Sequence, residues 1–293
     1  MKTLITGSTG FVGRAVMKKF AASGRSEDIV LLSSKRNELY PTFIYQYDGY
    51  KYSWELPQDI DTLVHIGAWT PKSARDFQDI DKGFGNISFT RSLLHSLSNL
   101  KRLVFISTID VYAPTKDPIS ETSPVKPISI YGYSKLYCEE MVKVWSEQLD
   151  VKCCILRLGH IYGVGEAAYK KLIPMLIQQS LKGETINIYS DGSELRSFLN
   201  VDDCARIIVQ ASQSGITGLY NVVSGNPVSV KEIAHTIKRL VNSNSDIVIQ
   251  NKQVETRDLV FDNSHLRDSF PGAEKELEQG LLEEIEYFKS LAE

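Results

Sequence analysis

Thr6-Gly7-Ser8-Thr9-Gly10-Phe11-Val12-Gly13 decides the fold of this 293-residue chain. The short apolar run Lys2 to Thr6 precedes the glycines, and Phe11 to Phe20 has the spacing of an amphipathic helix. Glycines between a strand and a helix allow a tight turn, and they let the backbone approach a pyrophosphate at the helix N-terminus. The stretch therefore predicts a dinucleotide-binding turn, with a turn that holds no ligand as the alternative. The residues predicted to contact the dinucleotide are Gly7, Thr9, Gly10, Phe11, Val12 and Gly13.

Short apolar segments alternate with polar or helical stretches through the first half of the chain. They are Ile29 to Leu32, Phe43 to Tyr47, Thr62 to Ile66, Arg102 to Ser107 and Lys152 to Leu158. This alternation predicts an α/β fold with a doubly wound parallel Rossmann sheet. After Gly163 the regularity ends, and helices are expected over Ala167 to Leu181 and over Leu277 to Leu291.

Two discontinuous domains follow from this pattern. Residues 1–165 with 200–225 are predicted to form the dinucleotide-binding domain, because Val201 to Ser212 and Leu219 to Val222 are expected to return to the sheet. Residues 166–199 with 226–293 are predicted to form a smaller, C-terminal substrate-binding lobe.

One Tyr-x-x-x-Lys pair stands out among the three in the chain. Tyr131 and Lys135 open the segment Tyr131 to Leu149, whose apolar residues recur at helical spacing. Residues four apart share one face of a helix, so the two side chains can act together. A nearby ammonium favours the phenolate and should lower the tyrosine pKa from its usual value of about 10, which makes Tyr131 a candidate acid or base. The other two pairs lie in segments that are not expected to be helical, one of them across a proline.

Six further landmarks follow in order along the chain. They are Val64-His65-Ile66-Gly67-Ala68, Asn86 at the start of a helix, Phe105 to Tyr112, Arg157 to Gly163, Arg196 to Asp203 and Tyr220 to Gly225. With the glycine turn and the Tyr131/Lys135 pair, they make the chain resemble, from end to end, the extended short-chain dehydrogenase/reductase family. This family contains nucleotide-sugar epimerases, dehydratases and 4-ketoreductases. The resemblance implies an NAD(P)-dependent enzyme that acts on a nucleotide-linked sugar.

The resemblance also implies roles beside the reacting carbonyl. Tyr131 would exchange the proton of the substrate oxygen, and Lys135 would also hold the nicotinamide ribose. Thr108 is the hydroxyl expected next to that oxygen, where it can donate a hydrogen bond as charge develops. Ser107 is the close alternative for this catalytic hydroxyl, and it is otherwise expected to contact the cofactor.

Further cofactor contacts are implied in the same way. Gly67 and Ala68 correspond to positions where the family's backbone approaches the cofactor. Asp48, after the third expected strand, corresponds to the aspartate that contacts the adenine, and a turn-capping role is equally compatible with its position.

The segment after the second expected strand bears on the choice of cofactor. An NAD site usually has an acidic residue about 20 positions past the glycines, where it bonds the adenosine ribose 2′-hydroxyl. This chain has Leu32-Ser33-Ser34-Lys35-Arg36 there. A 2′-phosphate would be repelled by a carboxylate but can pair with a guanidinium. We therefore expect NADP rather than NAD, held by Ser33, Lys35 and Arg36, with an ordinary solvated loop as the alternative.

Three residues point to the substrate by the same resemblance. Arg196 and Arg257 fall where the family places arginines near a nucleotide-sugar pyrophosphate, which suits a planar bidentate donor. A surface ion pair is the competing interpretation for Arg257. His160 stands where asparagine is usual, and it is expected to contact the sugar, to lend a proton or simply to pack.

The residues after Thr108 bear on the type of reaction. Dehydratases of the family have Asp-Glu there as acid and base for loss of water, whereas this chain has Ile109 and Asp110. Isoleucine cannot donate a proton, so 4,6-dehydration is disfavoured. Hydride transfer at C4 remains, as reduction of a 4-keto group or as epimerisation, and the expected NADP preference favours reduction. A reductase of carbonyls without a nucleotide, and an NADP-sensing regulatory protein, are the alternatives.

Composition excludes several other classes of protein. A net charge of −3 with 42% hydrophobic residues is typical of a globular protein and does not favour nucleic-acid binding. No apolar run has the length of a membrane span and no leader is visible, so a cytoplasmic protein without membrane contacts is expected. The four cysteines and five histidines lack metal-ligand spacing, so no metal site is expected. The helices after Asn86 and at Tyr131 resemble the family's dimer contact, which makes a homodimer the expected assembly.

Overall fold

The computed structural model describes residues 2–24, 26–48, 51–250 and 257–291. Two compact units make up the chain, and each comprises several segments. The first, called the sheet unit below, comprises Met1–Ala113, Pro124–Leu158 and Cys204–Asn221. The second unit comprises Pro114–Ser123, Gly159–Asp203 and Val222–Glu293. The lobe predicted from the sequence also includes residues 251–256 and 292–293, which lie outside the described residues.

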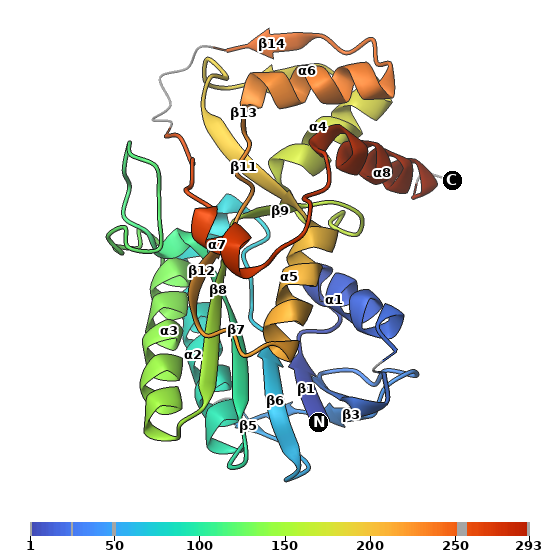
Figure 1. Ribbon diagram of the computed structural model, residues 1–293. Coiled ribbons are helices and arrows are strands. Elements are labelled where there is room, and N and C mark those ends of the chain that lie inside the picture. Colours follow the sequence, from blue (N-terminus) through green and yellow to red (C-terminus); the bar gives the residue numbers. More distant parts are fainter. Residues whose placement is uncertain (1, 25, 49–50, 251–256, 292–293) are drawn as a thin grey trace. The chain divides into compact units, whose positions relative to one another are not determined.

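A seven-stranded sheet forms the centre of the sheet unit, in the order β12-β8-β7-β6-β1-β2-β3 (Figure 1). Neighbouring strands from β3 to β8 pair in parallel, which confirms the predicted doubly wound α/β fold. The strands are β1 (Lys2–Thr6), β2 (Ile29–Ser33), β3 (Thr42–Ile44), β6 (Ile60–His65), β7 (Arg102–Thr108), β8 (Lys152–Leu158) and β12 (Gly218–Val222).

The strand order reverses between β1 and β6. From β1 the chain builds outward through β2 and β3, whereas from β6 it builds in the opposite direction through β7 and β8. Thr6 and His65, the last residues of β1 and β6, are direct neighbours in the register. Ligands of such sheets bind at the carboxyl ends of the strands at this reversal, because the connecting segments diverge there.

Helices cover both faces of the sheet. In Figure 1, α2 and α3 lie together on one side, and α1 and α5 lie on the other. Buried apolar side chains such as Leu93 of α2 and Val142 of α3 pack against Leu63 and Leu103 of the sheet in one continuous core. The helices are α1 (Phe11–Ala22), α2 (Ile80–His95), α3 (Ile130–Gln148) and α5 (Val201–Gln213), with short 3-10 turns η1 (Ser26–Asp28), η2 (Ala74–Gln78) and η3 (Ile109–Val111).

The third predicted strand is divided in two. Residues 42–44 pair with β2, which ends at Ser33, and the Tyr45 nitrogen donates to the Ser33 carbonyl at 3.2 Å. Residues 46–47 instead form β4 (Gln46–Tyr47), which pairs with β5 (Tyr52–Ser53) as a hairpin. The rings of Tyr45 and Tyr52 both pack on Phe89 of α2.

The second unit contains a three-stranded sheet and several helices. Its strands are β9 (His160–Tyr162), β11 (Leu195–Asn200) and β13 (Pro227–Ser229), with a separate pair β10 (Ile186–Ile188) and β14 (Ile247–Ile249). Its helices are α4 (Leu172–Lys182), α6 (Val230–Val241), α7 (Ser264–Ser269) and α8 (Leu277–Ser290). Apolar side chains of α4, α6 and α8, such as Ile177, Ile237 and Ile285, share one core.

The helix predicted from Ala167 begins five residues later, at Leu172. Pro174 explains the shift, because a proline lacks the N–H of a helical bond and clashes with the carbonyl four residues earlier. With Leu172 as the first helical residue, Pro174 falls in the first turn, where no such bond is required.

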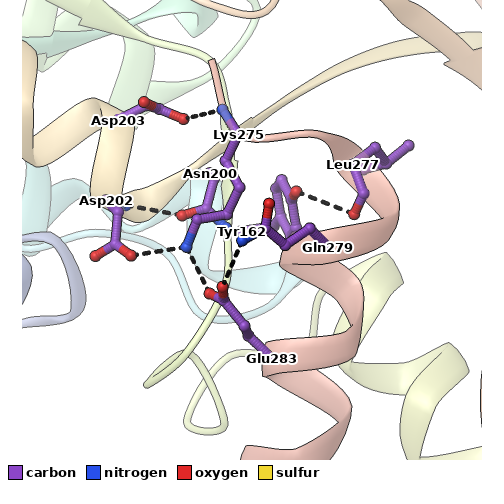
Figure 2. A network of polar contacts seen from close by, with 8 residues as sticks. All are labelled: Tyr162, Asn200, Asp202, Asp203, Lys275, Leu277, Gln279 and Glu283. Carbon is purple, nitrogen blue, oxygen red and sulfur yellow. Dashed lines mark hydrogen bonds and ion pairs between the residues drawn. The ribbon is translucent and has the colours of Figure 1, made fainter. Parts of the chain in front are cut away.

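Lys275 ties the start of α8 to the residues that open α5 within the second unit (Figure 2). Its ammonium is 2.9 Å from Asp202 Oδ2 and 2.5 Å from Glu283 Oε2. Its backbone nitrogen donates to Asp203 Oδ2 at 2.8 Å, and the Asn200 side chain accepts from the Asp202 nitrogen. The network therefore links α8 to the end of β11.

Replacing Gly13 by alanine should destabilise the protein, against the usual gain from alanine in a helix. A Cβ at Gly13 would lie 2.0 Å from the Gly7 carbonyl oxygen, so the helix or the turn must move. We expect a loss of about 1–3 kcal/mol in the free energy of unfolding, measured by denaturant titration. Gly85→Ala in α2 is the matched control, because its nearest atom is 3.8 Å away; it should stabilise by up to about 1 kcal/mol. Equal stability changes in the two variants would contradict the prediction.

Candidate active site

The glycine turn is crowded on one side and open on the other. Gly7 has φ +74°, and a Cβ there would lie 2.6 Å from the Gly67 nitrogen. A Cβ on Gly10 would meet nothing nearer than the Gly7 carbonyl oxygen at 3.4 Å, an ordinary contact. The first turn of α1, which the structure describes completely, has no acidic residue. The protein's own atoms thus do not demand glycine at position 10, whereas a pyrophosphate close to the helix N-terminus would, so these residues fit a dinucleotide.

A buried histidine links the ends of β1 and β6. Thr6 Oγ1 accepts from the Gly67 nitrogen at 2.8 Å and lies 2.8 Å from His65 Nδ1. His65 Nε2 is 3.0 Å from Thr90 Oγ1, and Thr90 donates to the Asn86 carbonyl. The hydroxyl of Thr90 donates to Asn86, so it can only accept from His65 Nε2–H. The hydroxyl of Thr6 then donates to His65 Nδ1, and this pattern requires a neutral ring. Burial, together with the charge of Lys135, lowers the pKa of His65 to about 3, so the ring stays neutral.

The two hydroxyls at the end of β7 have different surroundings. Ser107 Oγ is buried and donates to Glu139 Oε1 at 2.5 Å. Thr108 Oγ1 accepts from the Asp110 nitrogen at 3.2 Å and donates to Asp110 Oδ2 at 3.0 Å, which caps η3. Successive residues of a strand point to opposite faces, which gives the two hydroxyls different partners. Ser107 belongs to an internal network, and Thr108 faces the turn that follows the strand.

Tyr131 lies in the first turn of α3. Ser129 caps this helix by accepting from the Gly132 nitrogen at 3.0 Å. The Tyr131 side chain is only 7% exposed. Its ring packs edge-to-face against Trp69, at 6.2 Å between centroids, and against Phe77, at 5.9 Å. Both aromatic residues follow β6, so the segment after the strand reversal holds the phenol ring.

Two contacts dock α3 on β7. A Cβ on Gly132 would lie 2.5 Å from the Asp110 carbonyl oxygen, so the helix start packs directly against η3. One turn later, Lys135 Nζ donates to the Ile106 carbonyl at 2.6 Å and lies 4.3 Å from the centroid of the Phe105 ring. The structure thus brings the first turn of α3 to the end of the strand that carries Thr108.

Lys135 is almost completely buried, and its surroundings set its charge. Burial lowers its pKa from 10.5 to about 8, while the neighbouring Cys138 and Glu139 act in the opposite direction. The ammonium is therefore present at neutral pH, and it loses its proton as the pH rises through about 8.

The residues predicted to select the cofactor lie at the carboxyl end of β2. Ser33 is buried, and its hydroxyl accepts from the Lys35 nitrogen at 3.3 Å. Lys35 and Arg36 are exposed. Asp48 Oδ1 accepts from the Lys51 nitrogen at 2.9 Å, the geometry of a turn cap in the hairpin between β4 and β5. Ala68 follows Gly67 at the strand reversal and is partly exposed.

The three predicted substrate residues belong to the second unit. His160 of β9 and Phe198 of β11 are paired in register, and their ring centroids are 5.6 Å apart. Arg196 Nη1 donates to the Arg257 carbonyl at 2.7 Å. Burial, then the charges of Arg196, Lys171 and Arg257, lower the pKa of His160 to about 4. Within the part of the chain that the structure describes, the buried His160 Nδ1 has no hydrogen-bond partner.

Several residues of this region were missed in the sequence. Trp69 and Phe77 follow a recognised landmark but carry no motif of their own. His65 lies inside the landmark Val64 to Ala68, but the sequence assigns it no role. Glu139, which accepts from Ser107, lies four residues past Lys135, and this helical spacing was the available signal.

The chain is similar to known proteins in sequence and in fold. The sequence model of the NAD dependent epimerase/dehydratase family matches residues 3–223. The dTDP-glucose 4,6-dehydratase of Neisseria gonorrhoeae is 28% identical over 270 residues, which cover 81% of this chain and 77% of that protein.

Two solved structures share the fold over essentially the whole chain. UDP-glucose 4-epimerase from Thermotoga maritima, solved with UDP-glucose, has a TM-score of 0.83 at 22% identity and covers 100% of both chains. UDP-glucuronic acid 4-epimerase from Bacillus cereus, solved with UDP-4-deoxy-4-fluoro-glucuronic acid and NAD, has a TM-score of 0.84 at 24% identity and covers 99% of this chain and 100% of its own. With the family match and the glycine turn, the chain belongs to the NAD dependent epimerase/dehydratase family and is an enzyme of the extended short-chain dehydrogenase/reductase type.

Proposed function

We propose that this enzyme transfers hydride at C4 of a nucleotide-linked hexose, by reduction of a 4-keto group or by C4 epimerisation. The observation that carries the proposal is the docking of α3 on β7, through Lys135 Nζ and the Ile106 carbonyl at 2.6 Å, next to Thr108. Similar proteins act on or bind nucleotide sugars: one is named for dTDP-glucose, and two were solved with UDP-linked sugars.

In this proposal the protein's residues handle the proton and the developing charge. A nicotinamide cofactor would supply or accept the hydride when bound, and Gly7, Gly10 and Gly13 would hold its pyrophosphate. Tyr131 exchanges the proton of the C4 oxygen, and the Lys135 ammonium favours its phenolate form. Thr108 donates to the same oxygen as charge develops there, once its hydroxyl turns away from Asp110 Oδ2.

The substrate's nucleotide is assigned to the second unit. Arg196 and Arg257 are proposed to bind its pyrophosphate, because guanidinium groups pair with phosphate oxygens. His160 is proposed to contact the sugar through Nδ1. A neutral imidazole suits a hydroxyl group, since it can accept a hydrogen bond without adding charge.

Reduction is favoured over dehydration by the residues after Thr108. Elimination of water needs an acid and a base, whereas η3 offers only Asp110 beside the apolar Ile109. The Asp110 carboxylate is moreover engaged by the Thr108 hydroxyl. For the cofactor we propose NADP over NAD, held by the exposed Arg36 and Lys35. Reduction of a carbonyl without a nucleotide is the second candidate.

We also propose a cytoplasmic homodimer that pairs through α2 and α3. Ile80, Phe84 and Tyr137 are 71%, 57% and 60% exposed, and they line a hollow between these two helices. An apolar face of this kind is typical of a protein contact. Among the described helices, none is long and apolar enough to cross a membrane.

Assays with two sets of substrates test the proposed reaction. The enzyme is incubated with NADPH and nucleotide-linked 4-ketohexoses, and separately with oxidised cofactor and nucleotide-linked hexoses. Stoichiometric loss of reduced cofactor indicates reduction, whereas exchange of C4 epimers without net loss indicates epimerisation. Turnover of free aldehydes alone would overturn the assignment to nucleotide sugars.

Tyr131→Phe should lower kcat by about 10²–10⁴, because the proton donor is lost while the ring remains. Thermal stability and cofactor binding should stay near those of the wild type. Tyr133→Phe is the control, since this tyrosine is exposed and has Tyr137 rather than lysine four residues on. Near-normal turnover of Tyr131→Phe would refute the assigned role.

Arg36→Ala should weaken NADPH binding about tenfold or more, because a charge-assisted bond to the 2′-phosphate is lost. NADH affinity, measured in the same titrations by calorimetry, serves as the internal control and should not change. An unchanged preference for NADPH in the variant would remove Arg36 from the site, and a wild type that prefers NADH would refute the cofactor choice.

Phe84→Glu should convert the dimer into a monomer of 32.9 kDa, because it places a charge in the apolar face between α2 and α3. Mass is measured by light scattering during size-exclusion chromatography. Leu39→Glu is the control, since Leu39 is 85% exposed and lies outside this face. A monomeric wild type, or a dimeric Phe84→Glu, would contradict the proposal.

A further inference from the structure

Three buried residues of α3 follow one another at intervals of four: Tyr131, Lys135 and Glu139. Residues at this spacing lie on one face of a helix, one turn above the other. Their exposed fractions fall along the helix, from 7% through 3% to 0%. Glu139 therefore follows Lys135 by one helical turn on the same buried face.

The Glu139 carboxylate is held by three donors. Arg157 Nε donates to Oε1 at 2.9 Å, and Arg157 Nη2 donates to Oε2 at 2.6 Å, a bidentate pair. Ser107 Oγ donates to Oε1. The Arg157 side chain is 3% exposed and lies 4.7 Å above the Tyr112 ring. A buried charge with these partners has a fixed position and, because water is excluded, acts strongly on its neighbours.

We propose that Glu139 is a positioning residue of the active site, whose fixed negative charge keeps Lys135 in its ammonium form, while Arg157 opposes this effect and Ser107 fixes the carboxylate. The inference deepens the proposed function, on which its catalytic consequence rests. Glu139 touches neither substrate nor cofactor, and it acts through Lys135.

The other ionisable groups around Lys135 do not supply this negative charge. His65 of β6 is neutral, since burial keeps its pKa at about 3. Cys138 can raise the pKa of Lys135 only as a thiolate, and burial disfavours that form because it raises the pKa of the thiol. Tyr131 is the group that the ammonium is proposed to assist, and Arg157 of β8 is a cation. Among the described groups that act on Lys135, Glu139 is thus the anion.

The sign of the effect follows from burial. Burial alone disfavours the ammonium, Cys138 and Glu139 counter it, and the pKa of Lys135 stands at about 8. Removing the negative charge should lower the pKa of Lys135 further, and removing the Arg157 charge should raise it. A purely structural role for the pair would give no such opposite shifts.

The experiment measures the pKa of Lys135 directly. The full-length protein is labelled with ¹³C at lysine Cε, its spectra are followed over pH, and the signal is assigned with Lys135→Met. The variants are Glu139→Gln, Arg157→Gln and the double variant, which leaves no unpaired buried charge. Glu147→Gln is the matched control, because it removes the same charge from an exposed position of α3.

We expect Glu139→Gln to lower the pKa of Lys135 by about 1, and Arg157→Gln to raise it. The double variant should fall between the two, and Glu147→Gln should match the wild type. The alkaline fall of kcat/KM should move in the same direction as the pKa in each variant. If Glu139→Gln does not fold, the upward shift of the Lys135 pKa in Arg157→Gln, and its reversal in the double variant, still test the electrostatic effect of Glu139.

An unchanged pKa of Lys135 in Glu139→Gln, or shifts of the same sign in both single variants, would overturn the inference. The spectra need no substrate, so this outcome is independent of the proposed reaction. A wild type that turns over no nucleotide sugar would instead refute the proposed function and leave the electrostatic role to be judged from the spectra.

Discussion

The close approach of two backbone segments at the strand reversal is the constraint on which the rest of the sheet unit depends. Gly7 and Gly67 meet where β1 and β6 end, and a Cβ on Gly7 would lie 2.6 Å from the Gly67 nitrogen. The glycines leave room for the Thr6 hydroxyl to accept from Gly67 and to contact His65. Hydrogen bonds thus connect the ends of β1 and β6 at the carboxyl edge of the sheet.

Other buried polar groups attach the neighbouring helices to the sheet. His65 connects the end of β6 to Thr90 of α2, and Lys135 connects α3 to β7. Glu139 of α3 and Arg157 of β8 form an ion pair whose two charges are shielded from water. A buried pair of this kind contributes little net stability, because desolvation offsets the attraction. Its proposed role is to set the charge of Lys135.

Most of the sheet unit could be predicted from the sequence because its signals are local. The glycine turn, four of the five short apolar segments and the helix that opens at Tyr131 agree with the structure to within a few residues. The third strand and the start of α4 differ, since they depend on where β2 ends and on Pro174. The second unit was harder to predict, because its strands have only three to six residues and pair across long loops.

The sequence by itself determined the fold class, the family and the Tyr131/Lys135 pair, because glycine spacing and helical periodicity act over a few residues. Only the tertiary structure decided that Ser107 faces an internal carboxylate while Thr108 faces the turn after β7. It also decided that Trp69 and Phe77 hold the Tyr131 ring, and that Glu139 and Arg157 form one buried pair. These contacts join residues far apart in the chain, and their partners are set by how strands and helices pack, which no local pattern records.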